Sequence, residues 1–496
     1  MTLAGLLMLS SIAVPAAGAL GVRLVSTDGD GDGDEFDRYW LLSAILISIT
    51  GALTTALAVL LILEGASTYR LGFDGGFGFS VRSDALSATV GLLDVVLTLG
   101  ILGYTRTAGP HGRRFHASYL LFTAAVFGVV FSDDLLGTAG FLLVLIVATG
   151  RLVECGDKDG TRDAATGYRR TTVFGTAVYL LGVLVAAQMA GSSDAQQLAG
   201  TFQTIGYTEP VVIASFVCMT VGLAMLVALV PLHGWLVETH ARSPDPVSAL
   251  ISGVLPAAAV YALLRVLFDV FTVDFLAANP LVTNGIIYGA IVSLLVGNVL
   301  AYGQRNIKGM LAYSTVSQFG LVVAGLLVAT ETAVFGSVIQ LFGHGLVKGA
   351  FCLIAGIIAI RFDARTIDEF DGIADRAPVV AAAFAGLGIA MIGLPPTVGF
   401  VGKWYIAVGA LEEGLWIVAT FVVISTILTL GYVIPFVDHI YFGEFDGTDN
   451  GRETITSAMV VVTVGAVVLA LAIGLASVGF ESLLSEAISD LVDSPA

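Results

Sequence analysis

The sequence contains little charge for its length. Asp, Glu, Lys and Arg make up 12% of its 496 residues, about half of the share that is typical of a soluble domain. Hydrophobic residues make up 56%, and the mean hydropathy is +0.92. An ordinary soluble protein is therefore excluded, no nucleic-acid partner is expected, and the composition indicates an all-α multi-pass membrane protein. The 59 glycines against 13 prolines suit helices that pack closely in lipid.

Cysteine is also scarce. Cys155, Cys218 and Cys352 are scattered, and the last two lie in apolar runs, so the sequence supports neither a disulfide framework nor a metal site. It contains no cysteine cluster for iron–sulfur, and no Gly-rich nucleotide-binding motif followed by a helix. We therefore expect no cofactor, no metal and no catalytic site, and any redox chemistry would belong to partner subunits.

Lysine occurs at only four positions, while the loops are rich in Asp, as in the GDGDGDEFD run of residues 29–37. The net charge is −17. Acidic, lysine-poor loops suit a protein in concentrated salt, where repulsion between like charges is screened, so we infer a halophilic source. The alternative is an acidic loop that binds cations specifically.

A helix needs about 20 apolar residues to cross a membrane, and the sequence predicts fourteen such segments. They are 3–25, 39–63, 85–105, 115–132, 134–154, 171–191, 210–235, 246–269, 281–304, 309–329, 333–360, 378–410, 415–437 and 455–478. The twelfth is too long for one straight crossing and contains Pro395 and Pro396, which predicts a broken helix. No basic residue precedes the first apolar run, so we expect a retained helix and no cleaved signal peptide.

The basic residues predict the orientation. Most Lys and Arg residues fall in the odd-numbered connections, and the even-numbered ones hold only Arg70, Arg82 and Arg265. Because basic connections stay in the cytoplasm, we expect both termini outside a plasma membrane. Two lysines belong to no connection: Lys348 and Lys403 lie deep inside apolar segments.

A charged side chain at mid-bilayer costs roughly 2.5–3.5 kcal/mol, so each one is a functional candidate. Lys348 is too far from either end of its segment to reach a headgroup, and His344 shares its helical face. Lys403 follows the Pro-Pro break, where it either cycles between its charged and neutral forms in a proton relay or caps the broken helix. Asp94 belongs to the relay or hydrogen-bonds a neighbouring helix.

Four motifs resemble the proton-conducting antiporter family, which is shared by the large membrane subunits of respiratory complex I and of multisubunit Na+/H+ (Mrp-type) antiporters. The motifs are PLHGWLVETHARSPDPVSALISG from residue 231, NIKGMLAYSTVSQFG from residue 306, HGLVKGAFCLIAG from residue 344 and GLPPTVGFVGKWY from residue 393. The sequence KWYIAVGALEEG, preceded by DEFDGIADRAP, is most similar to the D-type Mrp subunit.

The resemblance implies about fourteen helices, two inverted five-helix repeats with a broken helix in each, and proton transfer along a central polar axis. It divides the single membrane domain into N-terminal helices (1–110), a first repeat (111–270), a second repeat (281–440), and a C-terminal helix with an acidic tail (455–496).

The resemblance also assigns roles to single residues. Lys403 matches the family's ionisable group in the second broken helix, and His344 and Lys348 match its polar pair in the preceding helix. Lys308, in a cytoplasmic-side connection, is interpreted as structural, although it and His233 of the PLHGW motif are possible polar contributors.

The first half departs from the family pattern. Leu226 and Ala257 stand where family members place lysines, and the family's glutamate in the fifth helix falls near Leu143. The resemblance therefore implies a first half-channel without its titratable groups.

Our main hypothesis is a proton-translocating, D-type-like subunit of a multisubunit cation/proton antiporter. Its partners would be other membrane subunits, and its ions would be protons and Na+. One alternative is an antiporter-like subunit of complex I (NADH-quinone oxidoreductase) or of a membrane-bound hydrogenase, driven by electron flow. The other is a scaffold subunit that retains the fold and conducts no protons.

Overall fold

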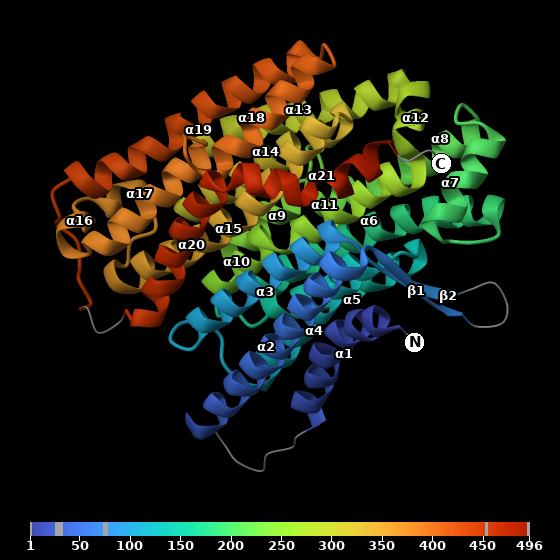
Figure 1. Cartoon of the computed structure of the whole chain (residues 1–496). Coiled ribbons are helices and arrows are strands. Elements are labelled where there is room, and N and C mark those ends of the chain that lie inside the picture. Colours follow the sequence, from blue (N-terminus) through green and yellow to red (C-terminus); the bar gives the residue numbers. More distant parts are fainter. Residues whose placement is uncertain (1, 25–32, 73–77, 452–454, 494–496) are drawn as a thin grey trace.

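The computed structural model describes residues 2–24, 33–72, 78–451 and 455–493. The described chain is an all-α membrane protein built around long, closely packed helices (Figure 1). Thirteen of its helical segments are long and apolar enough to cross a membrane. The pair α17 and α18 supplies a fourteenth crossing, so the predicted number of spans is confirmed.

The first part of the chain runs from the amino terminus to the first broken helix. Its elements are α1 (Leu3–Leu24), α2 (Gly33–Glu64), β1 (Ser67–Gly72), β2 (Gly78–Ser83), α3 (Ala85–Thr105), α4 (Arg113–Phe131), α5 (Leu135–Val153), α6 (Thr161–Ala190), α7 (Ala195–Ile205), α8 (Pro210–Val227) and α9 (Gly234–Arg242).

The second part begins with the segmented eighth crossing. Its elements are α10 (Asp245–Gly253), α11 (Leu255–Arg265), the π-helix η1 (Val266–Phe271), α12 (Thr272–Ala278), α13 (Pro280–Tyr302), α14 (Ile307–Val328), α15 (Glu331–Phe362), the 3-10 helix η2 (Ile367–Phe370), α16 (Ile373–Arg376), α17 (Pro378–Ile392), α18 (Val398–Glu412), α19 (Trp416–Phe442), α20 (Ser457–Leu475) and α21 (Ser477–Asp493).

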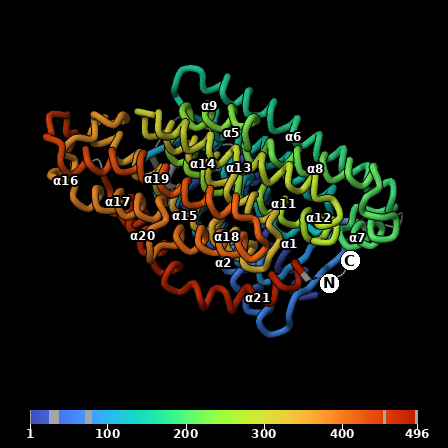
Figure 2. Tube along the Cα trace, turned by 90° about the horizontal axis from the view of Figure 1, so that it is seen from above, coloured from blue at the N-terminus to red at the C-terminus, as the bar shows by residue number. Residues whose placement is uncertain are grey.

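The two faces of the bundle differ. One, which we call the basic face, has a vestibule of about 330 Å³ lined by residues from the connections α3–α4, α5–α6 and α9–α10, with Arg365 after α15. The other, the hairpin face, carries the antiparallel β1–β2 hairpin and α7, which are joined by the Arg70–Asp194 ion pair. In both views the two chain ends lie at the end of the molecule that carries this hairpin (Figures 1 and 2).

Each repeat contains a broken helix. In the first, α8 ends at Val227, Ala228 has a positive φ of 62°, and α9 begins at Gly234. In the second, α17 ends at Ile392 before Gly393, whose φ is 82°. A residue in the left-handed region ends a helix, and proline prevents its continuation, so the break predicted at Pro395 and Pro396 is confirmed.

Small residues let the helices approach one another closely. Gly253 on α10 meets Gly345 on α15 so tightly that a Cβ on Gly253 would lie 2.8 Å from the Gly345 carbonyl oxygen. Gly222 on α8 leaves no room for a Cβ, which would overlap the main-chain nitrogen of Tyr179 on α6. Such contacts replace the hydrophobic effect as the source of helix association in lipid.

Two features of the fold differ from the prediction. The β hairpin was not expected, because residues 67–83 were interpreted as a loop between the second and third spans. The acidic tail is largely helical as α21, which packs against α15 and α3 and is drawn in red in Figure 2. The predicted acidic run at residues 29–37 lies outside the residues whose side chains the structure describes.

Arg265 corrects the count of basic residues in the connections. It ends α11 inside a candidate membrane span, with 12% of its side chain exposed, instead of lying in an even-numbered connection. The apolar residues on both sides of it extend the span to Ala278, beyond the predicted end at residue 269. Ion pairs with acidic partners allow an arginine to lie there.

Gly222→Ala should destabilise the protein. The added Cβ collides with main-chain atoms of α6, which cannot rotate away, so α6 and α8 must separate and lose packing. Gly285→Ala is the matched control, because its Cβ meets no atom within 4 Å. We expect the thermal midpoint in detergent to fall for Gly222→Ala and not to fall for Gly285→Ala, because alanine favours a helix over glycine where its Cβ has space; equal midpoints would contradict the packing argument.

Candidate functional site

Lys403 lies at the second helix break. Its side chain is buried, with 4% of its surface exposed. The ammonium Nζ donates a hydrogen bond of 2.7 Å to the carbonyl of Ile392, the last residue of α17, and lies 3.5 Å from the carbonyl oxygen of Met391. The positive charge thus meets the negative end of a half-helix inside the membrane. The lysine caps the broken helix, and this geometry is compatible with either role predicted for it.

Trp235 satisfies a carbonyl at the first break. Its indole Nε1 donates a hydrogen bond of 2.9 Å to the carbonyl of Met225 in the last turn of α8. The indole is neutral and has no proton to exchange near physiological pH, whereas an ammonium can release one. The Met225 carbonyl also accepts a hydrogen bond of 3.3 Å from the Ala228 backbone N–H, so the two breaks differ both in hydrogen bonding and in the chemistry of the side-chain donor.

Lys348 and His344 lie one turn apart on α15, as predicted, and both are buried. The Lys348 ammonium donates hydrogen bonds to the Ser314 hydroxyl and, at 3.3 Å, to the Leu311 carbonyl of α14. The His344 ring packs edge-on against Phe319, with 4.6 Å between the ring centroids. Helix α14 therefore supplies both polar and aromatic contacts for the pair.

A small cavity lies between this pair and the break at Lys403. Its lining includes His344, Lys348, Gln318, Gln340 and Met391, and its volume of about 10 Å³ is close to the minimum that holds one water molecule. The Gln340 amide donates a hydrogen bond of 2.8 Å to the Gln318 carbonyl oxygen. Three further polar atoms have no protein partner among the described residues: Gln318 Nε2, Gln340 Oε1 and His344 Nε2.

The two glutamines were missed by the sequence analysis, although each is a buried amide within a membrane-spanning helix. A buried amide left without partners loses roughly 1–3 kcal/mol. That cost marks an amide inside a predicted span as a candidate polar group. Gln318 and Gln340 were missed because they are uncharged and the candidates were limited to ionisable residues. They place a polar connection between Lys348 and the carbonyls that bind Lys403.

Lys308 lies at the basic-face end of α14. Its ammonium forms a 2.6 Å ion pair with Asp245 and donates hydrogen bonds to the Ser243 carbonyl (2.8 Å) and the Ser248 hydroxyl (3.2 Å). Asp245 and Ser243 also line the vestibule of the basic face. Lys308 therefore joins α14 to the start of α10 where water reaches the protein.

Asp94 and His233 lie apart from the Lys348–Lys403 region. Asp94 is buried on α3, and its Oδ2 atom has no hydrogen-bond partner among the described residues. His233 precedes α9 at the first break, with its ring 6.1 Å from that of Tyr313. No contact in the described part of the chain links either side chain to Lys348 or Lys403.

The positions of the missing family residues are apolar. Leu226 and Ala257 are buried, and Leu226 packs against Gly175 of α6. Leu143, however, does not lie in the interior: 38% of its surface is exposed on the outer side of α5, whereas its neighbour Leu142 is 1% exposed. A glutamate at Leu143 would therefore face outward, whereas one at Leu142 would face the interior, because successive residues of a helix point about 100° apart.

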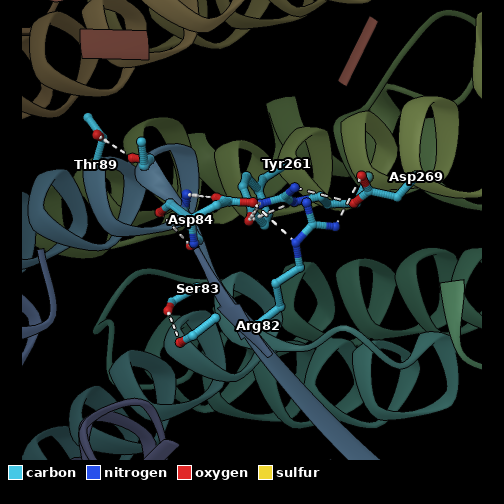
Figure 3. Close-up of polar contacts among 10 residues, drawn as sticks. Arg82, Ser83, Asp84, Thr89, Tyr261 and Asp269 are labelled. Carbon is cyan, nitrogen blue, oxygen red and sulfur yellow. Dashed lines mark hydrogen bonds and ion pairs between the residues drawn. The ribbon is translucent and has the colours of Figure 1, made fainter. Parts of the chain in front are cut away.

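A cluster of four charges, which we call the hairpin-face quartet, was also missed. It consists of Arg82 on β2, Asp84 at the amino end of α3, Arg265 on α11 and Asp269 on η1 (Figure 3). Arg265 lies 2.6 Å from Asp84 and 3.3 Å from Asp269, while Arg82 lies 3.5 Å and 3.4 Å from the same two carboxylates. The Tyr261 hydroxyl accepts hydrogen bonds from Arg265. The two arginines and two aspartates have no net charge together, and their ion pairs join β2 and the start of α3 to α11 and η1.

Two acids at the hairpin face have shifted pKa values in opposite directions. Burial by itself would raise the pKa of Asp84, but Arg265, Arg82 and the Ser87 backbone N–H hold it at about 2. Burial raises the pKa of Asp133 to about 6, against the attraction of Arg82. For Asp133, the attraction of the nearby arginines therefore does not fully offset the cost of burying a charged carboxylate.

Asp133→Asn should stabilise the protein at pH 8. A pKa raised from 3.8 to about 6 means that the folded state holds the proton more tightly, so stability is lost as the pH rises through 6. Asparagine imitates the protonated acid and avoids that loss, a gain of no more than about 3 kcal/mol. We expect a higher thermal midpoint than wild type at pH 8 and no difference below about pH 4.

The exposed acid Asp274 on α12 provides the control, since Asp274→Asn should leave the midpoint unchanged at both pH values. A gain for Asp133→Asn that does not depend on pH would contradict the assigned cause.

Comparisons with known proteins show which family and fold the chain resembles. A family model described as NADH:quinone oxidoreductase/Mrp antiporter, transmembrane, matches residues 132–429. NADH-quinone oxidoreductase subunit N of Desulforudis audaxviator (strain MP104C) is 33% identical over 419 residues, 82% of this chain and 81% of that protein. The D-type Na(+)/H(+) antiporter protein of Bacillus subtilis (strain 168) is 24% identical over 406 residues, 81% and 80% of the two chains. A chain in the structure of the Mrp complex from Dietzia sp. DQ12-45-1b matches with a TM-score of 0.89 and 22% identity, covering 99% of this chain and 98% of that one.

Proposed function

Because the chain belongs to the NADH:quinone oxidoreductase/Mrp antiporter transmembrane family, we propose that it translocates protons as a D-type-like subunit of a multisubunit monovalent cation/proton antiporter. Protons pass through the second repeat (281–440). Its partners are other membrane subunits, and Na+ is the cation exchanged.

The observation that carries the proposal is the contrast between the two breaks. At the second, a lysine that can release a proton binds the freed carbonyls, and a cavity with three unpartnered polar atoms connects it to His344 and Lys348. At the first, an indole binds a carbonyl, and the buried Leu226 packs against Gly175 of α6. Because a buried lysine exchanges protons readily and leucine does not, the second repeat (281–440) is the conducting one and the first (111–270) is degenerate.

The resemblance to subunit N supports a second candidate, an antiporter-like subunit of an NADH-quinone oxidoreductase. The Desulforudis protein is more similar in sequence than the Bacillus antiporter protein, at 33% against 24% identity. The two candidates share the proton path and differ in the driving force. Purification of the native complex separates them: an antiporter yields membrane subunits alone and Na+-dependent proton movement, whereas an oxidoreductase yields soluble redox subunits and NADH-dependent movement.

Lys403→Ala should abolish proton movement in vesicles that contain the whole complex, because the relay loses its titratable group at the break. The complex should still assemble, since alanine leaves no buried charge unpaired. The matched control is Leu226→Ala, which should cost roughly 2–5 kcal/mol of stability and leave the pH profile of transport unchanged. Wild-type transport by Lys403→Ala would support the scaffold role, and a shifted pH profile for Leu226→Ala would restore a path through the first half.

The basic face is proposed to be cytoplasmic, with both termini outside. In a background with the three cysteines replaced by serine, a cysteine at Gln197 on the hairpin face should react with a membrane-impermeant maleimide on intact cells. A cysteine at Asp159 on the basic face should react only after permeabilisation. Both positions are exposed, and the reversed pattern would place the termini inside.

A further inference from the structure

Three basic side chains, which we call the vestibule cations, line the vestibule of the basic face. They are Lys158 in the α5–α6 connection, Arg242 in the last turn of α9 and Arg365 after α15. Acidic residues outnumber Lys and Arg by 39 to 22 in the sequence, yet none of the three forms an ion pair with an acid in the described part of the chain. Their charges are therefore available to a ligand.

Two acids also line the vestibule, and they do not remove this excess of positive charge. Asp245 is already bound by Lys308, at 2.6 Å. Asp157 is exposed, and no ion pair joins it to the vestibule cations. Burial, together with Lys308 and Arg365, lowers the pKa of Lys158 to about 8, against the attraction of Asp245. An anion placed among these groups would relieve the repulsion between them.

The vestibule cations also have hydrogen-bond donors to spare. The Lys158 ammonium donates to the Ala241 carbonyl at 2.9 Å, and the Arg242 guanidinium donates to the Asp159 carbonyl. The Arg365 guanidinium makes no hydrogen bond within the described ranges of the chain. An ammonium carries three N–H groups and a guanidinium five. All three side chains can therefore bind an anion without giving up a contact that they already make.

A buried hydroxyl borders the same space. Tyr104, in the last turn of α3, is fully buried and lines the vestibule. Its hydroxyl has no hydrogen-bond partner among the described residues, and the charges of Asp245 and Arg365 act on it. Buried hydroxyl groups are nearly always hydrogen-bonded. The Tyr104 hydroxyl thus offers a neutral donor beside the unpaired guanidinium of Arg365.

We propose that the vestibule binds a phosphate group, held by the vestibule cations and the Tyr104 hydroxyl. A guanidinium fork matches the oxygens of phosphate, and an ammonium binds phosphate as a point charge. The donors come from four separate segments, which suits a tetrahedral anion with oxygens on every side better than a planar carboxylate. The volume of about 330 Å³ admits the group either as free phosphate or as part of a lipid headgroup.

Such a ligand would join segments that are far apart in the sequence. The donors belong to α3, the α5–α6 connection, α9 and the segment after α15. A ligand that binds only the folded state stabilises that state, so a bound phosphate holds the basic-face ends of these helices together. The inference goes beyond the proposed function, because it requires no proton movement.

The first test is calorimetric titration of the complete complex, in a neutral detergent and at constant ionic strength, with inorganic phosphate. We expect the affinity of Arg365→Gln to be at least about tenfold weaker than that of wild type, the change expected when one charge-assisted hydrogen bond is lost. The matched control is Arg305→Gln. It removes the same charge from the same face, but from an arginine that is already paired with Asp368, so it should bind phosphate as wild type does.

A second variant, Tyr104→Phe, separates a formed site from a region of positive potential. It keeps every charge and the aromatic ring, and it removes only the hydroxyl. We expect its affinity for the phosphate group to fall about tenfold. Wild-type affinity in Tyr104→Phe would overturn the proposal, and so would an equal loss in Arg365→Gln and Arg305→Gln. If Arg365→Gln fails to assemble, Arg242→Gln takes its place with the same expected loss.

Native mass spectrometry of the delipidated complex, supplied with phosphatidylglycerol, identifies the source of the phosphate. A lipid headgroup predicts that wild type retains the lipid, that Arg365→Gln and Tyr104→Phe lose it, and that inorganic phosphate binds weakly or not at all. Free phosphate predicts calorimetric binding and equal lipid retention in all variants. Absence of both kinds of binding in wild type would overturn the proposal, and none of these readouts depends on proton transport.

Discussion

The structure depends on one requirement: a carbonyl freed from a broken helix inside a membrane must find another donor. Lipid offers none, so the protein must supply it or admit water. At the first break an indole N–H meets the Met225 carbonyl, and at the second an ammonium meets that of Ile392. At the second break the donor carries a positive charge inside the membrane, and polar side chains lie near it because a buried charge needs polar neighbours. Where the donor is neutral, the buried positions Leu226 and Ala257 are apolar.

Much of the fold could be predicted from the sequence, because a membrane span needs only length and apolarity. The fourteen crossings and the break at Pro395 follow from those two properties. The β hairpin and α21 could not be predicted in this way, since both lie outside the spans, where hydropathy carries no information. Hydropathy also does not show which face of a helix is buried: Leu142 and Leu143 on α5 are equally apolar, but only Leu142 lies in the interior.

The candidate site could be predicted only in part. Lys348 and Lys403 stand out because a charge in an apolar run is costly, and their helical positions were predicted. The polar groups between them, Gln318 and Gln340, did not stand out because they are uncharged. Arg265 was missed for another reason. It was counted with the connections, although its ion pairs with Asp84 and Asp269 allow it to lie within a span.

The contact between Gly253 and Gly345 ties the two repeats together mechanically. The two main chains meet with no side chain between them, so neither helix can slide or rotate at that point without moving the other. Side-chain packing can absorb a small displacement by changing rotamers, but two touching backbones cannot. His344 is the residue next to this contact, and Ser252 is its counterpart on α10. The separation of α10 and α15 beside Ser252 and His344 is therefore set by a contact between two main chains, and it varies less than a separation set by side chains.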